Sequence, residues 1–134
     1  IVKSINKKGS EKLENFLIKN QKQNKSYVTE NSNKKAKKAI LYFKTIFELQ
    51  KYSLLKIKLE TGRHHQIRTQ LSNIGFPIKG DLKYGFPRSN NDGSIHLHSR
   101  KINFTHPVTK INIEIIAKPP KNNIWDLCLN CEEK

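Results

Sequence analysis

The chain has 134 residues, a length that suits one domain rather than two. Its formal net charge is +15, from 26 Lys and Arg against 11 Asp and Glu, which favours nucleic acid as a partner over a merely solvated lysine surface. No apolar run reaches the length of a membrane span, no signal peptide is visible, and two cysteines argue against a disulfide scaffold, so we expect a cytoplasmic protein.

The first half of the chain predicts one helix and several strands. Ser10 is suited to cap a helix in which Leu13, Phe16 and Leu17 would share one apolar face. Further on, apolar residues alternate with polar ones in two neighbouring segments, which is typical of an antiparallel hairpin. The expected elements are a strand at residues 1–3, a turn at 7–9, a helix at 11–19, a strand at 26–30 and hairpin strands at 39–49 and 55–60.

The second half predicts a helix followed by a β-rich region. Ile67, Leu71 and Ile74 recur at helical spacing, and Gly75 is placed to end that helix. Near the end of the chain, apolar residues alternate with polar ones again. The expected elements are a helix at residues 64–73, strands at 95–104 and 110–117, and a last helical turn at 124–129. This order predicts an α+β fold with a mostly antiparallel mixed sheet and a few short helices.

A block of polar side chains leads into the expected helix. Its sequence is Thr61-Gly62-Arg63-His64-His65-Gln66-Ile67-Arg68. Backbone amides also point outward at a helix start, so the block suits a bound anion or a buried carboxylate. Arg68 lies one step from Ile67 and hence near the packed face, where a guanidinium can hold a carboxylate or phosphate with two parallel hydrogen bonds. The alternative is a surface arginine that lies along the helix.

Three blocks of the sequence resemble signatures of one enzyme family. Residues 61–68 resemble Thr-Gly-Arg-Thr-His-Gln-Ile-Arg, with His64 where Thr is more usual, and residues 75–84 resemble Gly-His-Pro-Ile-x-Gly-Asp-x-x-Tyr. Leu97-His98 and, after it, Phe104-Thr105-His106-Pro107 resemble a Leu-His and Phe-x-His-Pro pair. In this order and at these separations, the blocks resemble the RluA-type ribosomal large-subunit pseudouridine synthases over essentially the whole chain.

That resemblance implies an enzyme that isomerises uridine to pseudouridine in RNA, with large-subunit rRNA as the partner and without a cofactor. In the family, a catalytic Asp of an Arg-Leu-Asp motif acts on a flipped-out uridine. By resemblance, Arg68 is the residue that pairs with this Asp and keeps it ionised. The expected RNA-binding residues are Arg63, His64, His65 and Gln66.

The chain contains no Arg-Leu-Asp motif and no methionine, and it begins with Ile1. We therefore expect residues 1–134 to be the C-terminal portion of a single catalytic domain, an incomplete pseudouridine synthase fold that is inactive alone. Asp81 has a counterpart in the family, and we interpret it as structuring its loop. The alternative from another functional class is a non-catalytic basic RNA-binding module.

Two other groups of residues have open interpretations. Cys128 and Cys131 have the spacing of zinc ligands and could join His96 and His98, but structural zinc sites usually have tighter local patterns, so we expect no metal. The lysines of two basic runs either touch RNA phosphates or are simply solvated, and salt-dependent binding would distinguish these. These lysines are Lys7, Lys8, Lys34, Lys35, Lys37 and Lys38.

Overall fold

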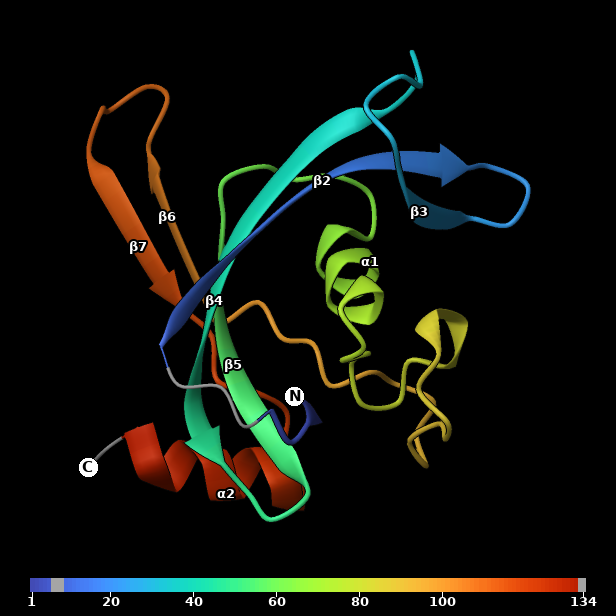
Figure 1. Ribbon diagram of the computed structural model, residues 1–134. Helices are drawn as coiled ribbons and strands as arrows, with labels where there is room; N and C mark the ends of the chain where they lie inside the picture. Colours follow the sequence, from blue (N-terminus) through green and yellow to red (C-terminus); the bar gives the residue numbers. More distant parts are fainter. Residues whose placement is uncertain (6–8, 133–134) are drawn as a thin grey trace. The chain divides into compact units, whose positions relative to one another are not determined.

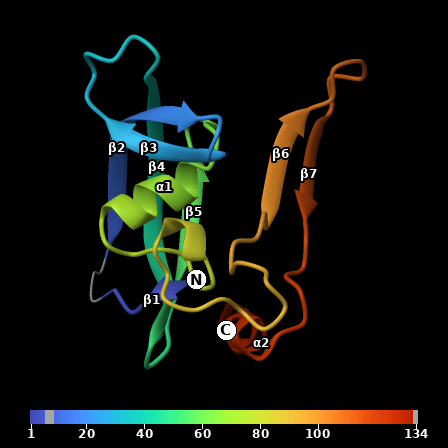
Figure 2. The same ribbon diagram turned by 90° about the vertical axis from the view of Figure 1, so that its right-hand side faces the viewer.

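The computed structural model describes residues 1–5 and 9–132, the last three of these by their backbone alone. Within that part, the chain forms two compact units, Ile1–His96 and Leu97–Lys134. Figures 1 and 2 together label the strands and α-helices of both units. The turn expected at residues 7–9 lies for the most part outside the described residues, so it stays a prediction.

The first unit is built on an antiparallel sheet of five strands, in the order β1-β5-β4-β2-β3. Its strands are β1 (Val2–Lys3), β2 (Ser10–Asn20), β3 (Lys25–Thr29), β4 (Lys37–Glu48) and β5 (Tyr52–Leu59). The pairing of β4 with β5 runs from Leu41 opposite Leu59 to Glu48 opposite Ser53, so the expected hairpin is confirmed. The short strands β1 and β3 were also expected and are confirmed.

The helix expected at residues 11–19 is wrong, because this segment belongs to strand β2. One edge of β2 pairs with β4 and the other pairs with β3, so both edges are hydrogen-bonded. Leu13 and Leu17 are four residues apart and share one face in a strand as well as in a helix, so their spacing could not separate the two. Pairing with two neighbouring strands, which no local pattern reports, decided for the strand.

Helix α1 (Gln66–Asn73) lies against one face of this sheet, as the two views in Figures 1 and 2 show. Leu71 of the helix, which is 1% exposed, joins Leu41 and Phe43 of β4 in the hydrophobic core. Ile67 and Ile74 pack against the same cluster. The apolar face that the sequence predicted for this helix is therefore the one that holds it on the sheet.

The segment after α1 turns back into the core. Gly75 adopts a left-handed φ of 86°, as expected of a residue that ends a helix. Ile78 is 1% exposed and forms a β-bridge with Val2. Asp81, also 1% exposed, and the 3₁₀ helix η1 (Leu82–Tyr84) follow. This return places a buried carboxylate and a tyrosine beside α1.

The second unit contains an antiparallel hairpin and a helix. These elements are β6 (Lys101–Thr105), β7 (Asn112–Ile116) and α2 (Asn123–Glu132). The strand expected at residues 95–104 is wrong in its first half, where the backbone forms no strand. His96 is still part of the first unit, and its N–H bonds to the carbonyl of Lys79 within that unit. The helical turn expected at residues 124–129 is confirmed as part of α2, and the α+β class with antiparallel sheets is confirmed as well.

Candidate functional site

The loop from β5 into α1 is held in place by the side chain of Gln66, which is 3% exposed. Its Oε1 accepts hydrogen bonds from Thr61 Oγ1 (2.8 Å) and from the N–H of Arg63 (2.9 Å). Its Nε2 donates to the carbonyl of Ile40 at 3.1 Å. The next residue back, His65, has a φ of 50°, which is uncommon for a residue other than glycine. The loop therefore holds His65 in one fixed orientation at the helix start.

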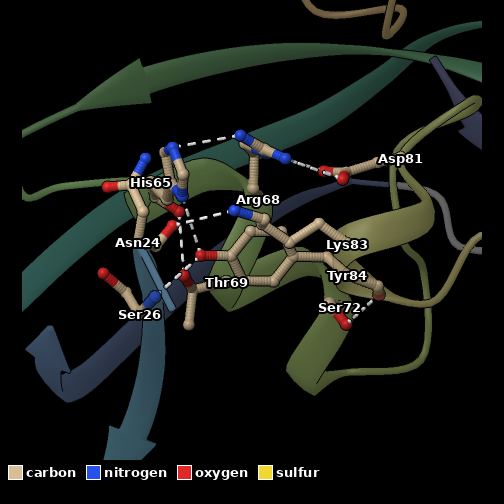
Figure 3. A network of polar contacts seen from close by, with 9 residues as sticks. All are labelled: Asn24, Ser26, His65, Arg68, Thr69, Ser72, Asp81, Lys83 and Tyr84. Atoms are coloured by element: carbon tan, nitrogen blue, oxygen red, sulfur yellow. Dashed lines mark hydrogen bonds and ion pairs between the residues drawn. The ribbon is translucent and has the colours of Figure 1, made fainter. Parts of the chain in front are cut away.

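Arg68 and Asp81 form a bidentate ion pair beside α1 (Figure 3). Nε and Nη2 of Arg68 each donate to one oxygen of the Asp81 carboxylate, and both distances are 2.8 Å. The carboxylate side chain is 1% exposed and that of the arginine is 19% exposed. Hydrogen bonding to Asp81 raises the pKa of Arg68, so the arginine stays charged. Two parallel charge-assisted hydrogen bonds fix the plane of the guanidinium.

His65 connects this ion pair to Tyr84. Nη1 of Arg68 lies 3.0 Å from His65 Nε2, and His65 Nδ1 lies 2.9 Å from the Tyr84 hydroxyl. Because an arginine can only donate, Nε2 accepts, and the neutral ring carries its proton on Nδ1 and donates it to Tyr84. That hydroxyl also accepts from the N–H of Ser26 in β3, at 2.8 Å. One chain of contacts thus runs from Asp81 to β3 (Figure 3).

Tyr84 also fixes the arginine through its ring. The central carbon of the Arg68 guanidinium lies 4.8 Å from the ring centre, within the range of a cation–π interaction. The tyrosine is 5% exposed, and its carbonyl accepts from Ser72 Oγ at 2.6 Å. Of the five N–H donors of a guanidinium, three are engaged in the contacts described. The remaining two, one on Nη1 and one on Nη2, have no partner in the described part of the chain.

The histidine at the centre of this network predicts a pH dependence of stability. Burial, and after it the charge of Arg68, lowers the pKa of His65 from 6.5 to about 4. At a pH between these two values, His65 is protonated in the unfolded chain but not in the folded chain. The free energy of unfolding is therefore expected to be highest above pH 6.5 and to decrease as the pH falls towards 4.

Urea unfolding at about pH 7.5 and about pH 5 measures this decrease. The control is the His65→Gln variant, which should lose less stability over the same interval. His64, whose pKa is also lowered by burial, is present in both proteins and so cancels in the comparison. An equal decrease in the two proteins would show that His65 does not resist protonation in the folded state.

The candidate residues from the sequence fall into two groups. The candidates are Arg63, His64, His65, Gln66 and Arg68. The last three make or support the network around the guanidinium, whereas Arg63 and His64 lie to its side. Nε of Arg63 donates to the carbonyl of Lys38 at 2.9 Å. The His64 ring stacks on that of His65, with 3.8 Å between ring centres, and its Nδ1 lies 2.8 Å from Ser26 Oγ.

Sequence reasoning missed two residues of this network, Tyr84 and Ser26. For Tyr84 a signal exists, because the Gly-Asp-x-x-Tyr block sets it three positions after Asp81, and η1 turns both residues towards α1. The sequence alone interprets Asp81 as a loop residue, and the structure gives it a partner in Arg68. No local signal could have indicated Ser26, which is 58 positions away from Tyr84.

Two kinds of feature are not found in the described part of the chain. No three described His, Cys, Asp or Glu side chains lie close enough together to hold a metal ion. His96 lies 2.7 Å from the Asn90 amide, and His98 lies 3.0 Å from the carbonyl of Ala117, while the Cys131 side chain is outside the described atoms. Among residues 1–5 and 9–132, no helix is long and apolar enough to cross a membrane.

Comparison with known proteins identifies the family of this chain. A family described as RNA pseudouridylate synthase matches residues 1–73, which include β1 to β5 and α1. The chain belongs to the RNA pseudouridylate synthase family. The family resemblance of the block around Arg68 is thereby confirmed, and relatives named ribosomal large subunit pseudouridine synthases C and D support the RluA type. Pseudouridine synthases are isomerases, so the family is one of enzymes.

Two similar bacterial proteins are longer than this pseudouridylate synthase chain. The "uncharacterized RNA pseudouridine synthase YlyB" of Bacillus subtilis is 37% identical over 86 residues, which are 64% of this chain and 28% of the relative. Ribosomal large subunit pseudouridine synthase D of Pseudomonas aeruginosa is 30% identical over 112 residues, 69% of this chain and 33% of the relative. The chain thus spans about a third of the length of these relatives.

Solved structures agree on the pseudouridylate synthase fold. Human RNA pseudouridylate synthase domain containing 1 matches 95% of this chain with a TM-score of 0.70, and the match covers 55% of the human chain. Human RNA pseudouridylate synthase domain containing 4 matches 89% of this chain with a TM-score of 0.68 and again covers 55% of the human chain. Both are 18% identical to this chain, so they are evidence for the fold alone.

Proposed function

We propose that this chain supplies the arginine-bearing part of an active site that isomerises uridine to pseudouridine in RNA. The observation that carries the proposal is the end of the Arg68 guanidinium, where two N–H donors have no partner in the described chain while Asp81 and His65 fix the rest. A side-chain exposure of 19% leaves this end within reach of another group.

The proposed role of Arg68 is to pair with the catalytic carboxylate and keep it ionised. The family carries that Asp in an Arg-Leu-Asp motif, and the 134 residues contain no such motif. Asp81 occupies the edge of the guanidinium formed by Nε and Nη2, and the end formed by Nη1 and Nη2 offers a second carboxylate a charged donor. A guanidinium within hydrogen-bonding distance of a carboxyl group lowers the pKa of that group and so favours its charged, reactive form.

The other candidates are proposed to act in two ways. Arg63 and His64 are at least partly exposed beside the network, and we assign them to direct contact with RNA. His65 and Gln66 are assigned to RNA binding through the turn that they hold, since Gln66 is buried and its side chain makes hydrogen bonds to Thr61, Arg63 and Ile40 within the chain. Fixed polar groups of this kind need little reorganisation when a substrate arrives.

The proposed RNA is large-subunit rRNA, and the support comes from the names of relatives. Several are named ribosomal large subunit pseudouridine synthase, including those of Zymomonas mobilis and Pseudomonas aeruginosa. One, from Pasteurella multocida, is named tRNA pseudouridine synthase C, so transfer RNA is the competing substrate to include in a test. A cytoplasmic location and a reaction without a cofactor complete the proposal.

A chimera tests the proposed activity. The 134 residues replace the matching part of the Pseudomonas aeruginosa synthase D, which then contributes the remaining segments of the active site. We expect the chimera to form pseudouridine in a large-subunit rRNA transcript and the chain alone to form none. The Arg68→Lys variant of the chimera keeps the charge but cannot make the bidentate contact, and its kcat is expected to fall by about 100-fold.

The matched control for this experiment is Arg88→Lys, since Arg88 is an exposed loop arginine of the same unit and has no role in the network. It should leave kcat unchanged. A chimera that unfolds cooperatively and binds RNA but forms no pseudouridine would overturn the proposed activity. The non-catalytic RNA-binding module would then be the better description of this chain.

A further inference from the structure

A basic hollow lies beside the Arg68 network. Its volume is about 350 Å³, and its lining residues come from the end of β2, the start of β3, the loop into β4 with the first residue of that strand, and the turn between β5 and α1. The charged residues of its lining are Lys19, Lys35, Lys37 and Arg63, with His64 at one side. No Asp or Glu is among the lining residues. All the charged side chains of the lining are therefore cationic, and they lie among apolar and uncharged residues such as Leu17 and Ile18. Nothing in the proposed function yet accounts for the three lysines.

These cations have no carboxylate to neutralise them among the described residues. The ion pairs of the first unit are made by other side chains, and the contrast with Lys38 is informative. That lysine is the immediate neighbour of Lys37 and pairs with Glu14 at 2.6 Å, whereas Lys37 lines the hollow without an acidic partner. Like charges gathered without counter-charges repel one another, and a bound anion would relieve this repulsion.

The arginine of the hollow is already oriented for a ligand. Nε of Arg63 donates to the carbonyl of Lys38 at 2.9 Å, and its backbone N–H donates to the buried amide of Gln66. These contacts fix the side chain at its base and at Nε and leave the two Nη groups free of partners in the described chain. A guanidinium with both Nη groups available matches the geometry of a phosphate.

The hollow is also connected to the candidate active site. His64 lines it and stacks on His65, with ring centres 3.8 Å apart, and His65 contacts Arg68 at 3.0 Å. After burial, the largest influence that lowers the pKa of His64 is the charge of Lys19, followed by that of Arg68. These contacts place the hollow two side chains, His64 and His65, away from the Arg68 guanidinium.

We propose that this hollow binds backbone phosphates of a single-stranded stretch of the RNA substrate, beside the nucleotide that enters the Arg68 site. The proposal rests on the proposed function for the identity of the polyanion. A single strand is favoured because a target uridine must leave its stack, and its neighbours then present phosphates on either side. Lys35 and Lys37 are the test residues, since both are exposed and neither belongs to the network.

The experiment compares two pairs of lysine substitutions in the full chain. One variant carries Lys35→Gln and Lys37→Gln, and the control carries Lys56→Gln and Lys58→Gln, which remove the same charge from exposed positions of β5 outside the hollow. The Kd for a single-stranded RNA oligonucleotide is measured over a series of KCl concentrations. For the hollow variant, we expect the slope of log K against log salt to become shallower by about 0.7 to 1.4 and the Kd to rise about tenfold, while the control keeps the wild-type slope.

The outcomes separate this proposal from the proposed activity, because binding is measured without turnover. Equal changes in both variants would mean that diffuse charge binds the RNA, and the hollow proposal would be overturned even if the chimera is active. A change confined to the hollow variant would support it even if the chimera is inactive.

Inorganic phosphate is titrated into the free protein as a second arm. If it saturates the hollow at the concentrations that RNA requires, the ligand is free phosphate and the assignment to RNA is overturned.

Discussion

Replacing Arg68 by alanine is expected to destabilise the protein by about 3–5 kcal/mol, the usual effect of removing one partner from a buried ion pair. Asp81 is 1% exposed, and among the described side chains Arg68 supplies the hydrogen bonds to both of its carboxylate oxygens. Without the guanidinium, the carboxylate has to be protonated, stay charged and unpaired, or move towards water, and each of these is unfavourable. Urea unfolding at neutral pH measures the loss.

A double-mutant cycle provides the control for this prediction. In the Asp81→Asn background the buried group is neutral, so Arg68→Ala is expected to destabilise much less than it does in the wild-type chain. If the two substitutions are additive, the loss reflects the other contacts of Arg68, with Tyr84 and His65, and the ion pair is not what holds the site. Arg68→Lys should fall between the extremes, because an ammonium cannot reproduce the bidentate geometry.

The second large effect is expected from Gly80→Ala, one position before the buried carboxylate. Gly80 has a φ of 87°, and a Cβ there would lie 2.5 Å from Asn90 Nδ2 and 2.8 Å from the backbone oxygen of Ser94. A left-handed conformation disfavours any residue with a Cβ, and the backbone oxygen cannot move aside as a flexible side chain could. The two effects together are expected to destabilise the protein by about 2–5 kcal/mol in urea unfolding.

Gly75→Ala is the matched control for Gly80→Ala. Gly75 has nearly the same φ, 86°, but a Cβ there would meet no atom within 4 Å. Gly75→Ala should therefore destabilise the protein only through the left-handed backbone conformation, by about 1–2 kcal/mol. Equal losses in the two variants would show that the loop relaxes around the added methyl group. If Gly80→Ala also displaces Asp81, the chimera that carries it should lose activity together with stability, whereas Gly75→Ala should keep activity.

Part of the fold could be predicted because its pattern is local. Alternating apolar residues predicted the hairpin of β4 and β5, and the stripe of Ile67, Leu71 and Ile74 predicted both α1 and the face that it buries. These predictions hold because burial of one face is what each pattern encodes. Strand β2 could not be predicted in this way, since Leu13 and Leu17 suit a helix and a strand equally and the choice depended on pairing with β3 and β4.

The sequence predicted only one of the two segments that form the candidate site. The block that ends at Arg68 stood out because its polar residues gather before an apolar stripe, and the geometry does bring Arg68 and His65 together. Asp81 and Tyr84 complete the network from a separate segment, and only the turn of the chain through the core brings them to α1. The hollow likewise combines β2 with two loops that are far apart in sequence.

By itself the sequence determined the family, the α+β class and the helix that presents Arg68, because motif spacing and hydrophobic periodicity are properties of short stretches. Only the tertiary structure decided what Arg68 binds. Its partner Asp81 lies 13 positions away, and Ser26 of β3, which donates to the Tyr84 hydroxyl, lies 58 positions before that tyrosine. The physical reason is that a buried charge takes the partner that the packed core places within hydrogen-bonding distance, and no local pattern of residues specifies that distance.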